Sequence, residues 1–282
     1  MRLGYLGPEG TFSEEAVRSA PDAAGAQLVA LPTVRDTILA VHEGTVDRAV
    51  VPIENSLEGP IGVTLDTLAS DDTDVVITGE VVVPVSPCLI ARDGVAVADI
   101  ERVLSHPQAT SQCARFLHER LPQADVMAVA STAEAVRLVV AEAAPWGALG
   151  TRRAAALYGA TVLAEEVEDE PGNATRFVWI EREEAPLDPS AAAKTSLVFQ
   201  GSGDTSPGWL VRCLSEFAFR GVNLTKIESR PQRARLGHYR FFVDCEGAAG
   251  EDAVAGAIDG LRKHCEGVKI LGSYATADGG AG

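Results

Sequence analysis

The stretch Asn173-Ala174-Thr175-Arg176-Phe177 combines an amide, a hydroxyl and a guanidinium, groups with which a protein binds and protonates an anion. An acidic, turn-prone run ending in Pro171-Gly172 precedes it, and the apolar, β-rich run from Phe177 to Ile180 follows. Thr175 and Arg176 are therefore predicted where a loop enters a strand, which holds side chains more firmly than a free loop does. Taken alone, the stretch also fits a strand-edge threonine beside a surface salt bridge.

Three other polar groups lie where ligands commonly bind. Two of them directly follow predicted strands, at residues 48–53 and 102–104, and the carboxyl ends of strands are the ligand-binding edge of α/β folds. The third opens a helix after the first predicted strand, and the free N–H groups of a helix start suit an anion. Each residue also fits a plain cap or turn. The candidate ligand-binding residues in these places are Thr11, Ser13, Glu54, Asn55, Ser56, Ser105, His106 and Gln112.

The elements that position these residues alternate between strand and helix, which predicts an α/β fold. We expect two lobes around a cleft, arranged like those of periplasmic binding proteins, with lobe one at about 1–80 plus 164–182 and lobe two at about 81–163. A strongly β-branched strand pair carries the chain between them. Strands are predicted at 2–7, 28–31, 48–53, 75–85, 102–104, 126–129, 147–150 and 161–164, and helices at 33–42, 63–68, 113–121, 132–143 and 152–158.

The pattern changes after residue 185. Residues 186–193 have the composition of a linker. Residues 194–275 then read as strand, helix, strand, strand, helix and strand, which is the order of a ferredoxin-like unit. Residues 276–282 form an expected frayed tail. The sequence therefore predicts a catalytic region at 1–185 and a separate smaller domain behind it.

The composition limits the partners and the compartment. A formal charge of −16 argues against nucleic acid and anionic membranes as partners. The five cysteines are odd in number and scattered, which favours reduced thiols in a cytoplasmic protein over disulfides or a zinc site. The start of the chain lacks the apolar core of an export signal, and no run has the length of a membrane span.

Four motifs in order resemble the prephenate dehydratase family, and the resemblance covers nearly the whole chain. The fourth resembles that family's regulatory ACT domain. In some relatives a chorismate mutase precedes this unit, but this chain begins on the first predicted strand, so we expect that activity to be absent. The motifs are Gly4 to Ser13, Pro52 to Ser56 together with Ser105 to Gln108, Asn173-x-Thr175-Arg176-Phe177, and Leu224 to Pro231.

The resemblance implies that the catalytic region turns prephenate, a dianion, into phenylpyruvate by expelling water and carbon dioxide. Aromatisation drives this reaction, so no cofactor and no metal are expected. The resemblance gives Thr175 the delivery of a proton to the leaving hydroxyl, with Arg176 and Phe177 completing the cleft wall. Arg176 suits a carboxylate clamp because its fork is bidentate. Glu54 either assists as a protonated acid or orders Arg176, and His106 is a further candidate donor.

Binding of the substrate is expected at Thr11, Ser13, Asn55, Ser56, Ser105, His106, Gln112 and Asn173. Two alternatives remain open at this stage. The enzyme could act on arogenate, the amino analogue, or the two lobes could form a non-catalytic regulator that binds an amino acid or carboxylate.

The ACT resemblance implies feedback control by L-phenylalanine, bound between paired domains of a homodimer or homotetramer. One residue departs from the pattern, because Trp209 stands where the family usually has a small alanine. Its indole either covers apolar surface or fills the effector pocket. The residues implied in the effector site are Gly208, Trp209, Leu210, Asn223, Glu228, Ser229, Arg230 and Pro231.

Overall fold

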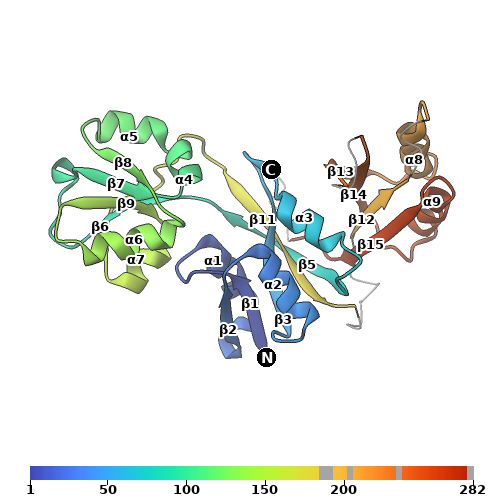
Figure 1. Cartoon of the computed structure of the whole chain (residues 1–282), viewed down its shortest axis with the longest axis horizontal. Coiled ribbons are helices and arrows are strands. Elements are labelled where there is room, and N and C mark those ends of the chain that lie inside the picture. The colour runs from blue at the N-terminus through green and yellow to red at the C-terminus, as the bar shows by residue number, and fades with distance from the viewer. Residues whose placement is uncertain (184–192, 202–205, 233–236, 278–282) are drawn as a thin grey trace.

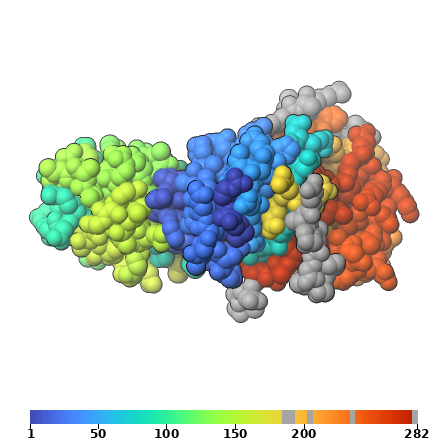
Figure 2. All heavy atoms as spheres, turned by 90° about the horizontal axis from the view of Figure 1, so that it is seen from below, coloured from blue at the N-terminus to red at the C-terminus, as the bar shows by residue number. Residues whose placement is uncertain are grey.

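The computed structural model describes residues 1–183, 193–201, 206–232 and 237–277. Three units follow one another along the long axis of the molecule, as Figure 1 shows. Lobe two lies at one end, lobe one in the middle and the C-terminal domain at the other end. The space-filling view in Figure 2 shows the same order from another side.

Lobe one is built on a mixed sheet in the order β2-β1-β3-β11-β5, with the short β4 paired to β3. Its strands β1, β2 and β3 are parallel, whereas β11 runs antiparallel between β3 and β5. The centre of β3 is buried, as expected for a strand covered on both faces. The elements are β1 (Arg2–Leu6), α1 (Phe12–Arg18), η1 (Ala23–Gly25), β2 (Gln27–Leu31), α2 (Val34–His42), β3 (Arg48–Asn55), β4 (Gly59–Pro60), α3 (Gly62–Leu68), β5 (Val75–Pro84) and β11 (Ala174–Arg182).

Lobe two has a second mixed sheet in the order β10-β6-β9-β7-β8. Helix α6 packs against its inner strands through Ala133, Val136 and Val139. The elements are β6 (Cys88–Ala91), η2 (Val97–Asp99), β7 (Arg102–Ser105), α4 (Pro107–Gln112), α5 (Ala114–Arg120), β8 (Asp125–Ala128), α6 (Thr132–Ala141), β9 (Trp146–Gly150), α7 (Arg152–Tyr158) and β10 (Thr161–Ala164).

The predicted lobe boundaries need correction at both crossings. Strand β5 stays in the first sheet up to Pro84, so the chain enters lobe two between Pro84 and Cys88 rather than near residue 81. Strand β10 pairs with β6 in the second sheet, so the chain returns to lobe one between Ala164 and Ala174, not at residue 164. The acidic run before Asn173 is therefore the return crossing.

The C-terminal domain has the predicted order of elements, and its sheet order β13-β14-β12-β15 is that of a ferredoxin-like unit. Most of the predicted linker at 186–193, and the tail from residue 278, lie outside the described residues. The elements are β12 (Lys194–Gln200), α8 (Trp209–Ala218), β13 (Leu224–Pro231), β14 (Tyr239–Glu246), α9 (Asp252–Arg262) and β15 (Gly267–Tyr274).

Both faces of this C-terminal sheet are covered. Helices α8 and α9 pack on one face through Phe217 and Leu261. The other face rests on lobe one, because Val198, Phe242 and Leu271 belong to the same buried cluster as residues of β3, β5 and α3. The C-terminal domain is therefore docked on the back of the lobe-one sheet.

Candidate active site

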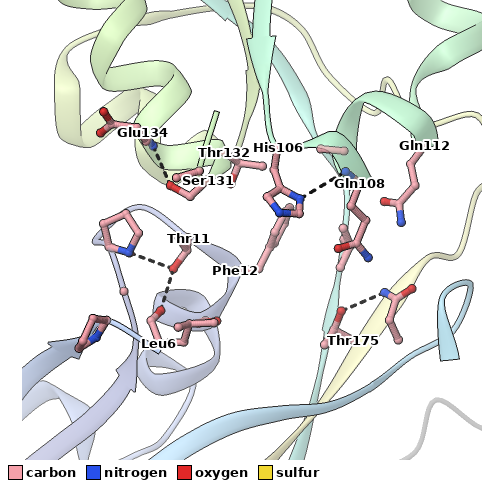
Figure 3. A pocket seen from close by; sticks show the side chains of 18 residues that line it. Leu6, Thr11, Phe12, His106, Gln108, Gln112, Ser131, Thr132, Glu134 and Thr175 are labelled. Atoms are coloured by element: carbon pink, nitrogen blue, oxygen red, sulfur yellow. Dashed lines mark hydrogen bonds between the residues drawn. The ribbon is translucent and has the colours of Figure 1, made fainter. Parts of the chain in front are cut away.

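A cleft of about 510 Å³ lies between the two lobes. Figure 3 shows that lobe one contributes Thr11 and Phe12, that lobe two contributes His106, Gln112 and Ser131 opposite them, and that Thr175 lies at the base. The lining residues are Leu6, Gly7, Pro8, Thr11, Phe12, Ser13, Pro32, Asn55, Val85, His106, Gln108, Ala109, Gln112, Ala130, Ser131, Thr132, Glu134 and Thr175.

Thr175 and Asn55 are cross-strand partners on β11 and β3, and both line the cleft. The side-chain amide Nδ2 of Asn55 donates to Thr175 Oγ1 at 3.0 Å. The orientation of this amide is fixed, because Asn55 Oδ1 accepts the backbone N–H groups of Leu57 and Glu58, both at 3.0 Å. The Thr175 oxygen thus accepts a hydrogen bond while its own proton stays free for a group in the cleft.

Asn173 lies behind the cleft wall, where it supports the residues that line it. Its Oδ1 accepts from Asn55 Nδ2 at 2.9 Å, and its Nδ2 donates to Gln112 Oε1 at 2.9 Å. The side chain is 3% exposed and does not line the cleft. Because Asn55 belongs to lobe one and Gln112 to lobe two, Asn173 fixes one residue of each lobe.

Two predicted substrate ligands are also structural residues. Ser105 is fully buried and donates to the backbone oxygen of Leu149 at 2.8 Å. Ser56 accepts the N–H of Ala174 at 3.0 Å and donates to Asn173 Oδ1 at 3.3 Å. Neither hydroxyl faces the cleft, so the prediction that they bind substrate is corrected.

Arg176 lies on the opposite face of β11 from Thr175, as the alternation of a strand requires. Its guanidinium binds Glu54 at 3.1 Å, Glu80 at 3.1 Å and Asp244 of the C-terminal domain at 2.8 Å. Burial alone would lower the pKa of Arg176, but nearby negative charges, Asp244 first, raise it overall. The predicted carboxylate clamp is therefore corrected, because Arg176 points away from the cleft.

The two other residues assigned to the chemistry near Arg176 also lie elsewhere. Glu54 pairs with Arg176 and with Lys226 Nζ at 3.0 Å, so of its two predicted roles the structure supports the ordering of Arg176. Phe177 is 2% exposed and packs with Leu3 and Tyr5 in the core of lobe one. Neither side chain lines the cleft.

Helix starts surround the cleft. Thr11 is the N-cap of α1 and accepts the N–H of Glu14 at 3.4 Å, and Ser13 lines the cleft from the first turn of that helix. His106 caps α4 by accepting the N–H of Gln108 at 3.3 Å. None of the described lining residues is lysine or arginine. The helix starts therefore present N–H groups, neutral side chains and the positive ends of their dipoles to the cleft, an arrangement that suits an anion.

The start of α6 was predicted at residue 132, but its place in the cleft was not. Ser131 caps this helix by accepting the N–H of Glu134 at 3.0 Å, and Ser131 and Thr132 both line the cleft. The signal was present, since Ser131 followed by Glu134 has capping-box spacing. The apolar lining residues Phe12, Pro32 and Val85 carry no comparable signal.

A second contact between the lobes lies behind α1. Arg153 of lobe two binds Glu14 at 2.8 Å, and Thr151 donates to the backbone oxygen of Gly10 at 2.7 Å. Burial alone would raise the pKa of Glu14, but hydrogen bonds from Arg153, Gly10 and Arg18 lower it overall. The carboxylate that joins the lobes therefore stays ionised.

The predicted effector residues lie in different environments of the C-terminal domain. Trp209 is buried between Phe199 and Phe241, and its Nε1 donates to the oxygen of His264 at 2.7 Å. Its indole is thus part of the domain's own core. Arg230 binds Asp66 of α3 at 3.0 Å. Gly208 has a φ of 76°, Leu210 packs against the core of the domain, and the side chain of Asn223 donates to Glu246. The remaining predicted effector residues lie on β13 and are Glu228, Ser229 and Pro231.

Within the described ranges, no group of three or more His, Cys, Asp or Glu residues is arranged to hold a metal ion. The same part of the chain contains no helix that is long and apolar enough to cross a membrane.

Two α/β lobes that enclose a cleft lined by hydroxyl and amide groups, with a further domain docked behind them, are the architecture of a protein that binds a small molecule. The chain belongs to the prephenate dehydratase family, whose model matches residues 3–185. It is 41% identical to a prephenate dehydratase of Mycolicibacterium vanbaalenii, over 98% of this chain and 91% of that one.

Two solved structures are similar over 99% of the chain. One is prephenate dehydratase from Arthrobacter aurescens in complex with L-Phe, at 39% identity and a TM-score of 0.91, with 91% of that chain covered. The other is GqqA, described as a novel type of quorum quenching acylase, at 30% identity and a TM-score of 0.88, with 99% of that chain covered.

Proposed function

We propose that the chain converts prephenate into phenylpyruvate, with loss of water and carbon dioxide, in the biosynthesis of L-phenylalanine. The observation that carries this proposal is the Thr175 hydroxyl at the base of the cleft, oriented by Asn55 in a member of the prephenate dehydratase family. We place the enzyme in the cytoplasm, where its five free thiols remain reduced.

The roles of the residues follow from the needs of the reaction. Thr175 delivers a proton to the ring hydroxyl, which leaves as water. The bond between the ring carbon and its carboxylate breaks at the same time, carbon dioxide leaves, and the electron pair of that bond makes the ring aromatic. A threonine hydroxyl is a poor acid, so it acts within a hydrogen-bonded relay, for which His106 in the same cleft is the remaining candidate donor. A positioned acid contributes about 10²–10⁴-fold in rate.

The two carboxylates of prephenate bind to the neutral donors of the cleft. The predicted ligands that the structure keeps in the lining are Thr11, Ser13, Asn55, His106 and Gln112, and Ser131 and Thr132 join them. The lobes, joined by two crossings at the cleft, support the predicted likeness to periplasmic binding proteins.

The experiment is a comparison of substrates with purified protein. Phenylpyruvate formation from prephenate, followed by absorbance in alkali, is expected, with arogenate tested in parallel. A larger kcat/KM with arogenate would make the amino analogue the substrate. Binding of prephenate without turnover would favour a non-catalytic regulator, and turnover of an acylated amine alone would favour the acylase activity described for GqqA.

We also propose that the C-terminal domain is an ACT domain that binds L-phenylalanine. Its ferredoxin-like order and the L-Phe complex of the Arthrobacter aurescens relative support this. Trp209 packs in the core of its own domain, so its indole does not fill an effector site between the paired C-terminal domains of two chains.

Millimolar L-phenylalanine is expected to change prephenate turnover several-fold, since allosteric coupling is typically about 1–3 kcal/mol. Turnover and calorimetry on the full chain measure this effect, with D-phenylalanine as the control. Absence of both binding heat and any change in turnover would contradict the regulatory proposal.

The enzyme is proposed to be a homodimer or homotetramer joined through the C-terminal domain. Strand β13 lies at the edge of its sheet, and the nearby Val211, Phe219 and Ile227 are 66%, 85% and 49% exposed. An open edge beside exposed apolar side chains is suited to pairing with a second copy. Light scattering is expected to give at least twice the 29.5 kDa of one chain, and Phe219→Asp should shift the mass downward. A monomer at micromolar concentration would refute the proposal.

A further inference from the structure

Strands β3 and β11 present two adjacent residue pairs to opposite sides of the lobe-one sheet. Asn55 and Thr175 are opposite each other in the ladder and face the cleft. Glu54 and Arg176, the next pair along, face the C-terminal domain. A shift of one pair in the backbone therefore shifts the other, because the two pairs are separated by a single peptide unit on each strand.

Six charged residues form a largely buried cluster on that second side, which we call the tether. Three come from lobe one and three from the C-terminal domain, with three acids balanced by three bases. Arg176 binds all three acids, Lys194 binds Glu80 at 2.8 Å and Lys226 binds Glu54 at 3.0 Å. The members are Glu54, Glu80 and Arg176 of lobe one, and Lys194, Lys226 and Asp244 of the C-terminal domain.

Most of the tether is sheltered from solvent. The side chains of Glu80, Asp244 and Lys226 are 4%, 8% and 10% exposed, whereas that of Glu54 is 36% exposed. Buried charges depend strongly on their partners, because removal of one leaves the other uncompensated in a medium of low dielectric. Asp244 is itself held by Ser196, whose Oγ donates to it at 2.6 Å.

The backbone at this point is irregular. The β3–β11 register passes from the pair Glu54–Arg176 to the pair Pro52–Phe177, so it skips Ile53. Such bulges are common beside active sites, where they aim a side chain and interrupt the ladder. The β3–β11 ladder is interrupted after Arg176, one residue from Thr175, whereas the ladder between β11 and β5 is regular there. On the β3 side, side-chain contacts therefore add to the ladder in holding Thr175 in place.

We propose that Lys226 and Asp244 of the C-terminal domain are positioning residues for the catalytic pair Asn55 and Thr175. They hold Glu54 and Arg176 from behind, and these hold the two strands in the register that aims the Thr175 hydroxyl into the cleft. The docked domain thereby completes the active site without touching the substrate. This inference rests on the proposed dehydratase function for its kinetic readout.

The test compares variants that break the tether with one that breaks a different contact between the same two units. Lys226→Met and Asp244→Asn remove one charge each from the tether. The matched control is Asp66→Asn, which breaks the pair with Arg230 at 3.0 Å on α3, away from β3 and β11. We expect kcat to fall about ten- to a hundred-fold in the tether variants, as for a displaced catalytic group, with KM within about twofold.

Two further readouts separate positioning from stability. Lys226→Arg keeps the charge and should recover most of kcat, while thermal unfolding should report similar losses for Lys226→Met and Asp66→Asn. The side-chain amide resonance of Asn55, assigned with Asn55→Asp, should shift in both tether variants and not in Asp66→Asn.

The outcomes are distinct. Wild-type kcat together with an unshifted Asn55 resonance in both tether variants would overturn the inference. If the wild type does not turn over prephenate, the proposed function fails, and the Asn55 resonance still decides whether the tether positions the pair.

Discussion

Thr175→Val is expected to lower kcat for prephenate by about 10²–10⁴-fold while KM changes little. Valine keeps the shape of threonine and removes the hydroxyl that delivers the proton. The neighbouring Asn55 amide keeps two acceptors, Asn173 Oδ1 at 2.9 Å and the Ala174 oxygen at 3.1 Å. No buried donor is left unpaired, so the loss reports on the chemical step and not on a damaged cleft.

Thr175→Ser is the matched control, since serine restores the hydroxyl without the methyl group. It should recover much of the lost kcat, whereas binding of prephenate should be similar in all three proteins. A Thr175→Val protein with the wild-type turnover number would remove Thr175 from the chemistry and leave His106 as the donor within the cleft.

The location of the proposed catalytic pair was predictable from the sequence, because Asn55 and Thr175 each stand where a polar run meets a predicted strand. The two were not predicted to be neighbours, since the antiparallel entry of β11 beside β3 joins residues that are 120 positions apart. Such a pairing depends on how the chain returns from lobe two, which no local pattern specifies.

The assignment of Arg176 to the substrate was wrong for a reason visible in the sequence. Consecutive side chains of a strand point to opposite faces, so Thr175 and Arg176 cannot both face one cleft. The family motif groups Thr175 with Arg176 in one site, but the alternation of a strand places their side chains on opposite faces. Where Arg176 goes instead was not predictable, because its partner Asp244 lies in a domain expected to be held only by a linker.

The orientation of Trp209 was also not predictable from the sequence. The sequence left two possibilities for its indole, to cover apolar surface or to fill the effector pocket, and the ring packs against Phe199 and Phe241, with centroid separations of 6.0 and 5.8 Å. The spacing of Leu210, Leu214 and Phe217 in the sequence indicates the inward face of α8, but it does not indicate which way the first residue, Trp209, points.

Gly272→Ala is expected to weaken the docking of the C-terminal domain on lobe one. Gly272 lies in β15, and a Cβ atom there would stand 2.1 Å from the backbone oxygen of Ile77 and 2.9 Å from its carbonyl carbon. Both atoms belong to the backbone of β5, which cannot move aside without disturbing the sheet. Overpacking typically costs about 1–3 kcal/mol, which lowers the unfolding temperature by several degrees.

The same substitution is expected to reduce kcat, because the sheet of the C-terminal domain carries Lys226 and Asp244 of the tether. Gly250→Ala is the matched control in the same domain, since an added Cβ there meets no atom within 4 Å. Thermal unfolding and prephenate turnover of both variants measure the effect. If Gly272→Ala matched Gly250→Ala in both, β15 would not rest on β5 as closely as the structure shows. A loss of stability with full kcat would instead mean that Thr175 is held in place without the docked domain.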